Sequence, residues 1–162
     1  REFIKTLSPN KRTAIINVGT PDVTVFEKEL ALVYKNAVAY NLKKDANAND
    51  IANVLRQINP DDQVIIGVVD TRTRPGNNIP LSADLKMMLS DMAKKDAVFA
   101  LFANPYNLAG LPGLEHAKAL LVAYQKEDYM QVSAASVFKN QLITTGKLPV
   151  TVSEFFKYGQ GL

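Results

Sequence analysis

AVFALFANPYNLAGLPGLEHAKALLVAYQ, residues 97–125, contains two short apolar runs, Ala97 to Ala103 and Ala119 to Tyr124. Each run is too short to cross a membrane and too uniformly apolar for a strand with one face in water. Strands that are covered on both faces have this pattern. We therefore expect both runs to lie at the centre of a parallel sheet.

The rest of the chain alternates between strand-like and helix-like patterns. Runs of apolar and β-branched residues predict strands at 13–19, 37–42 and 63–69, and a turn with a final short strand at 146–152. Apolar residues at helical spacing predict helices at 25–35, between Asn47 and Pro60, at 82–95 and at 127–138. This alternation with short links predicts an α/β fold: a three-layer, open, mostly parallel sheet with helices on both faces, as in flavodoxin-like or Rossmann-like domains.

The composition is that of an ordinary globular domain. With 162 residues, 47% of them apolar and 22% charged, the chain is large enough to bury a stable core without disulfides or structural metals. We expect a single domain, 1–162, with its core at 11–152 and a linker-like tail at 153–162, excised from a larger enzyme. No run approaches the roughly 20 apolar residues of a membrane-spanning helix.

The residue types present limit the chemistry. The absence of cysteine excludes disulfides, thiol catalysis and thiolate metal sites, and a single histidine, His116, excludes sites of several histidines. No GxSxG motif accompanies His116, so we interpret it as an exposed loop residue. The net charge of +3 is spread along the chain without a basic stripe, which disfavours nucleic-acid binding. We expect neither a metal nor a cofactor.

Polar and aromatic residues follow the predicted strands at their carboxyl ends, where open α/β sheets bind ligands or partners. The candidate substrate-binding or domain-docking residues are Asp70, Arg72, Arg74, Asn104, Tyr106 and Tyr124. Asp70 and its arginines form either a loop ion pair without a ligand or a site for a hydroxyl or anionic group. An aspartate held ionised is a poor general acid. The two tyrosines are either a sugar platform or half-buried strand ends.

The turn after the first predicted strand raises the question of a phosphate site. Residues 18–21, VGTP, lack both the GxGxxG spacing and the GK[ST] ending of phosphate-binding loops. Pro21 also removes an amide donor from such a loop. Nucleotide binding is therefore disfavoured, although a flavodoxin-like binder of nucleotide or phosphate stays open as an alternative.

Several motifs together resemble one known family. They are FANPYNL at 102–108, ALLVAY at 119–124, Gln131 with Ala134 and Ala135 in the last helix, and GKLPVTV at 146–152. The chain resembles, over roughly Lys11 to Val152, the carboxyl-terminal α/β domain of family 3 glycoside hydrolases, in the branch of bacterial β-N-acetylglucosaminidases. Asn140 stands where relatives often have glycine. Because Asn also tolerates left-handed backbone, we expect the turn after the last helix to be kept.

The resemblance implies that catalysis takes place in another domain. In that family an amino-terminal (β/α)8 barrel carries the aspartate nucleophile. The β-glucosidase branch takes an acid/base glutamate from the second domain, but residues 70–82 here contain no glutamate. In the N-acetylglucosaminidase branch the acid/base is a histidine of the barrel. We therefore expect no catalytic residue in this chain, which on its own should be inactive.

The expected function is that of an accessory domain in an enzyme that acts on β-linked N-acetylglucosamine or related glycosides. Its partners would be the barrel of the same parent chain and the carbohydrate substrate of that parent. The resemblance also favours a periplasmic or secreted bacterial protein. The alternatives are a stand-alone carbohydrate-binding module that uses Asp70, Arg72 and Tyr124, and the flavodoxin-like small-ligand binder.

Overall fold

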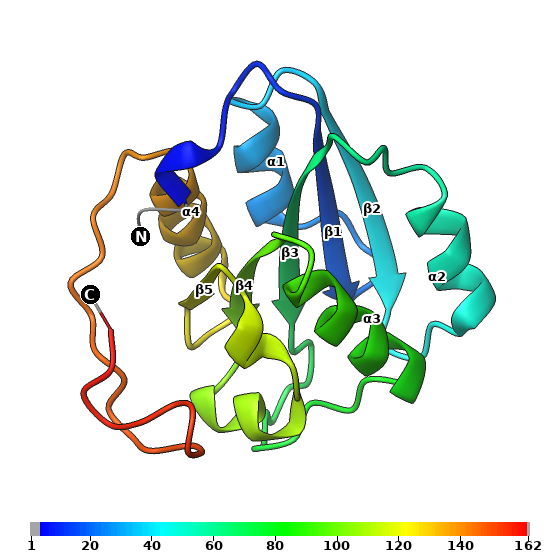
Figure 1. The fold of residues 1–162 in the computed structure, drawn as a ribbon. Helices are drawn as coiled ribbons and strands as arrows, with labels where there is room; N and C mark the ends of the chain where they lie inside the picture. Colours follow the sequence, from blue (N-terminus) through cyan, green and yellow to red (C-terminus); the bar gives the residue numbers. More distant parts are fainter. Residues whose placement is uncertain (1–3, 162) are drawn as a thin grey trace.

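The computed structural model describes residues 4–161 and shows a five-stranded, all-parallel sheet between two layers of helices (Figure 1). The strands are β1 (Thr13–Gly19), β2 (Ala37–Lys43), β3 (Gln63–Val69), β4 (Val98–Phe102) and β5 (Ala119–Val122). Their order, β2-β1-β3-β4-β5, is that of flavodoxin-like doubly wound folds. The predicted three-layer α/β fold is confirmed. Residues 1–3 and 162 of the expected domain lie outside the described residues.

Helices cover both faces of the sheet. On one face lie α1 (Val25–Ala31) and α4 (Asp128–Phe138), and on the other lie α2 (Ala48–Leu55) and α3 (Ala83–Ala93) (Figure 1). Three 3-10 helices, η1 (Ile4–Thr6), η2 (Pro105–Gly110) and η3 (Leu114–His116), complete the described part. None of the helices within residues 4–161 has the length and apolar character needed to cross a membrane.

The helix starts follow from capping side chains in the sequence. The Asn47 side chain accepts hydrogen bonds from the amides of Asn49 and Asp50 and so caps α2. Ser82 caps α3 in the same way, by accepting from the Leu85 amide at 3.2 Å. Asn140, after α4, has a φ of 57°, the left-handed backbone that we predicted.

The second apolar run does not lie at the centre of the sheet. Its strand, β5, pairs with β4 and forms an edge of the sheet, and residues 120–122 are half-buried. The prediction of a central strand is therefore wrong for this run, whereas β4 is buried throughout. Leu120 and Val122 pack against the same core cluster as Phe156, which belongs to the irregular segment after α4. This packing explains why an edge strand carries apolar residues.

The predicted strand within 146–152 is also wrong. Among the described residues, an isolated antiparallel bridge between Lys147 and Gly161 is the only strand-like pairing in this segment. Pro149 has no amide hydrogen with which to continue a ladder, which explains why the pairing stops. The expected tail, 153–162, folds back on this bridge as far as residue 161.

The helix predicted at 25–35 is shorter in the structure. It ends at Ala31, and the Val33 amide then donates to the Leu30 carbonyl in a tighter turn. Beyond that turn Tyr34 is 2% exposed, and its hydroxyl donates to the Phe138 carbonyl oxygen at 2.9 Å. The early end of α1 thus lets a tyrosine join the core beneath α4.

Burial raises the pKa of Tyr34 to about 12, from an ordinary value of 10.0. Because the folded state holds this proton more tightly than the unfolded chain, the stabilisation is complete below pH 10 and is lost as the pH rises towards 12. We expect the free energy of unfolding to fall by roughly 2 kcal/mol over that interval. Urea unfolding of Tyr34→Phe should show this loss abolished, and the exposed control Tyr158→Phe should retain it. An unchanged pH dependence in Tyr34→Phe would refute the assignment.

Candidate functional site

Asp70 follows β3 directly and is only 3% exposed. Arg72 donates from Nε and Nη2 to its two carboxylate oxygens at 2.8 and 2.7 Å, and from its backbone amide at 3.2 Å. Burial alone would raise the pKa of Asp70, but the hydrogen bonds and charge of Arg72, with a smaller contribution from Lys126, outweigh it and lower that pKa below 3.8. Asp70 is therefore ionised at neutral pH and unsuited to donate a proton.

The loop after β3 and the 3-10 helix η2 are held together by hydrogen bonds, an arrangement that we call the loop lock. Arg72 Nη2 donates to the Gly76 carbonyl oxygen at 3.2 Å, and Asn107 Nδ2 donates to the same oxygen at 3.0 Å. Asn104 Nδ2 donates to Asn77 Oδ1 at 3.4 Å. Two loops from neighbouring strands thus form one surface at the carboxyl edge of the sheet.

Asn107 belongs to the loop lock but was not among the candidate site residues predicted from the sequence. It is fully buried, and its Nδ2 also donates to the Asn104 carbonyl at 2.8 Å. Its Oδ1 has no hydrogen-bond partner among residues 4–161. A buried carbonyl oxygen of this kind is normally satisfied by an ordered water or by a donor from a partner.

The remaining predicted residues take no part in the hydrogen bonds of the loop lock. Arg74 is exposed in the loop after β3, and Tyr106 is 41% exposed on η2 at the same edge of the sheet. Tyr124 lies just after β5 and lines a separate pocket, to which neither Asp70 nor Arg72 contributes. The structure therefore brings Asp70, Arg72 and Asn104 into one hydrogen-bonded network and places Tyr124 elsewhere.

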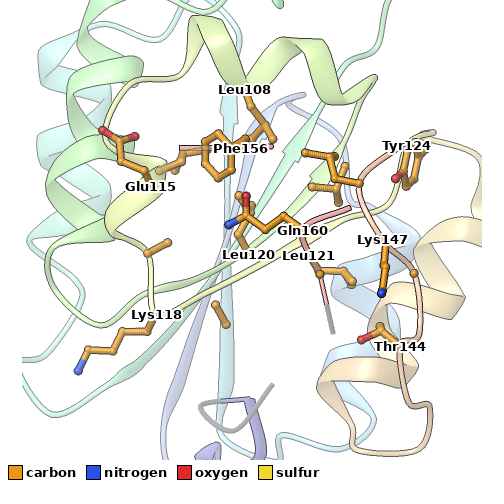
Figure 2. Close-up of a pocket in the computed structure, with 17 residues that line it drawn as sticks. Leu108, Glu115, Lys118, Leu120, Leu121, Tyr124, Thr144, Lys147, Phe156 and Gln160 are labelled. Carbon is orange, nitrogen blue, oxygen red and sulfur yellow. The ribbon is translucent and has the colours of Figure 1, made fainter. Parts of the chain in front are cut away.

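That pocket has a volume of about 480 Å³ and lies between β5 and the segment after α4 (Figure 2). Its lining is mostly apolar, with polar groups from Glu115, Thr144, Lys147 and Gln160. Tyr124 has a φ of 64°, a left-handed conformation that is unfavourable for a bulky residue and is often found at functional sites. The sequence did not predict this pocket.

Lys126 connects the end of β5 to the loop lock. Its Nζ donates to the carbonyl oxygens of Thr71 and Arg72, at 3.0 Å in each case. Because a lysine ammonium has three donors, this side chain still has one donor beyond these two bonds. The carboxyl ends of β3 and β5 are thus tied by the same cation that helps to keep Asp70 ionised.

The start of α1, where a phosphate would bind in a nucleotide-binding domain, is occupied by protein groups. The Phe26 amide donates to Gln131 Oε1 at 3.0 Å, and the Glu27 amide donates to the Thr24 hydroxyl at 3.0 Å. With these donors engaged, few are left to cradle a phosphate. This arrangement argues against the nucleotide-binding alternative.

Gln131→Leu is expected to lower the free energy of unfolding by about 2 kcal/mol. Gln131 is 7% exposed and bridges two segments, since it accepts from the Phe26 amide and donates to the Lys126 carbonyl at 2.6 Å. Leucine fills the same space but leaves both backbone groups unpaired. The exposed Gln141→Leu is the matched control for urea unfolding. Equal losses in the two variants would show that this bridge contributes nothing.

The single histidine and, among residues 4–161, the acidic residues other than Asp70 take no part in the hydrogen bonds of the loop lock. The side chain of His116 is 59% exposed, as predicted, although the residue ends the 3-10 helix η3 and is not in a loop. It lies 3.8 Å from Glu115 in a weak pair. Within the described ranges, no three residues among His, Cys, Asp and Glu are grouped to hold a metal ion. The candidate functional features are therefore the loop lock and the pocket beside β5.

Comparisons with known proteins do not identify the chain. No family model, curated protein or solved structure matches it. The function is therefore argued from the two sites described above and from the resemblance of the motifs at 102–108, 119–124 and 146–152.

Proposed function

We propose that this chain is a non-catalytic accessory domain of a family 3 glycoside hydrolase that acts on β-linked N-acetylglucosamine or related glycosides. In this proposal the carboxyl edge of the sheet packs against a (β/α)8 barrel of the same parent chain and borders its sugar site. The observation that supports the proposal most is the loop lock, in which Asp70 is fully engaged by Arg72. A surface held rigid in this way loses little entropy when it docks.

The chemistry of the carboxyl edge also favours an accessory role. Glycoside hydrolysis generally uses two carboxyl groups, of which the acid needs a raised pKa. Asp70 has a lowered pKa because the contacts of Arg72 outweigh its burial, and the stretch 70–82 contains no glutamate. A domain with this edge suits positioning and docking, while the hydrolytic step belongs to the barrel.

A carbohydrate-binding module is the second candidate. It is favoured by two half-exposed aromatic residues next to the carboxyl edge, Tyr106 and Tyr124, which are 41% and 39% exposed. Aromatic rings that present one face to water are suited to stacking on sugars. The two tyrosines belong to different features, however, since only Tyr124 lines the pocket.

Titration calorimetry with N-acetylglucosamine and with chitobiose separates the two candidates. For the accessory domain we expect no heat of binding from the chain alone at millimolar sugar. Saturable heat that is lost in Tyr106→Ala or Tyr124→Ala would instead support the binding module. The exposed Tyr129→Ala, which lies on α4, is the matched control for the loss of a surface tyrosine.

A further inference from the structure

The outer side of β5 is an open edge of the sheet. The Ala123 amide donates to the Leu101 carbonyl at 2.9 Å, and Leu101 lies opposite Val122 in the parallel register. In such a ladder alternate residues of the edge strand bond inwards, so the backbone groups of Leu120 and Val122 point away from β4. In residues 4–161 no hydrogen bond joins these outward groups to another segment.

The pocket beside β5 follows this open edge. Leu120 to Val122 line the pocket together with Thr144, Gly146, Lys147 and Leu148, and Phe156 lies at the end away from Thr144 and Lys147 (Figure 2). The volume of about 480 Å³ is in the usual range of ligand sites.

Three charged side chains line the pocket, Glu115, Lys118 and Lys147, and Lys118 Nζ pairs with Asp96 at 2.8 Å. Glu115 and Lys147 lie on opposite sides of the pocket (Figure 2). Glu115 accepts a hydrogen bond from the Gly113 amide at 2.8 Å and lies 3.8 Å from His116. Lys147 Nζ has no hydrogen-bond or ion-pair partner in the described part of the chain. The pocket therefore offers an uncompensated cation at the Lys147 side, which favours an acidic group there.

The part of the chain that follows β5 exposes many large apolar side chains. Of the eleven large apolar side chains exposed in the described residues, seven belong to the stretch 124–158. They are Tyr124, Tyr129, Val132, Leu142, Ile143, Phe155 and Tyr158. Tyr124 is the one of these that lines the pocket, and exposed aromatic residues are enriched at surfaces that contact other proteins.

We propose that the pocket binds an extended peptide segment of a partner protein, which pairs with β5 as a sixth strand and places an acidic side chain beside Lys147. The backbone groups of Leu120 and Val122 hydrogen-bond to the peptide backbone. Alternate apolar side chains of the peptide enter the pocket against Phe156. This site is independent of the loop lock, so the inference stands whether or not the accessory role is correct.

The test uses a fluorescein-labelled octapeptide of alternating valine and threonine that ends in two glutamates. Its binding to the chain is measured by fluorescence polarisation. The full chain should bind this peptide saturably. Val122→Pro should weaken binding about tenfold or more, because it removes one outward amide donor but no bond to β4. Val122→Ala keeps that amide and should bind within about threefold of the wild type. Urea unfolding confirms that each variant is folded.

A charge exchange tests the role of Lys147. Lys147→Glu should lose affinity for the glutamate peptide and gain affinity for the same peptide ending in two lysines. The proposal is overturned if no peptide binds saturably at millimolar concentration, or if the variants and the wild type bind equally. Sedimentation velocity that shows a dimer lost in Val122→Pro would also overturn it, because the occupant would then be a second copy of this chain.

Discussion

Gly19→Ala is expected to lower the free energy of unfolding by about 4 kcal/mol. Gly19 ends β1 with a φ of 103°, which L side chains rarely adopt. A Cβ at this position would lie 2.2 Å from the Val69 carbonyl oxygen. That oxygen belongs to β3, the central strand, so no side-chain rotation relieves the contact, and the turn that leads into α1 must move.

Urea unfolding followed by circular dichroism measures this loss. Gly146→Ala is the matched control, because no atom lies within 4 Å of the added Cβ and its φ is not in the left-handed region. We expect that control to change the free energy of unfolding by less than about 1 kcal/mol. A loss below about 1 kcal/mol in Gly19→Ala would contradict the close contact between residue 19 and the Val69 carbonyl oxygen.

Asp70→Ala should lower the free energy of unfolding by about 3 kcal/mol at neutral pH. The carboxylate side chain is 2% exposed and the Arg72 side chain 29%, so the variant leaves a partly buried guanidinium without its partner. The Arg72 bond to Gly76 cannot replace the three bonds from Arg72 to Asp70 that are lost. Because Asp70 holds the loop after β3 through Arg72, the loop lock should loosen as well.

The dependence on pH gives a second readout of the same pair. The pKa of Asp70 is lowered in the folded state, so its stabilisation is present above the ordinary value of 3.8 and is lost as the pH falls through the folded-state pKa. The difference between wild type and Asp70→Ala should therefore shrink below pH 3.8. Asp45→Ala breaks an exposed pair with Lys43 and should cost less than about 1 kcal/mol. Equal costs for the two variants would contradict the structural role of Asp70.

Local patterns were sufficient to predict the fold class. Buried strands and capped helices depend on neighbouring residues, as at Asn47 and Ser82, so their patterns can be read from the sequence. The position of β5 could not be predicted in this way. An apolar run has the same sequence pattern whether helices or an irregular segment cover it. The segment after α4 has no helical or strand periodicity, so its packing near Leu120 and Val122 could not be predicted.

The candidate site was also predicted only where its contacts are local in the sequence. Asp70 and Arg72 are two residues apart, and their pairing could be anticipated from their proximity. Asn107 and Gln131 were missed as structural residues because their contacts are long-range. Asn107 reaches Gly76 across 31 residues, and Gln131 reaches Phe26 across 105. Such contacts follow only from the assembled sheet.

The most direct measurement of the accessory role is hydrolysis of an aryl β-N-acetylglucosaminide by the barrel encoded in the same reading frame, with and without this chain. The proposal predicts no turnover by this chain alone and higher turnover by the barrel when the chain is present. Arg74→Glu, a charge reversal at the exposed carboxyl edge, should reduce that increase. Turnover by this chain alone, or a reading frame that encodes no barrel, would contradict the proposal.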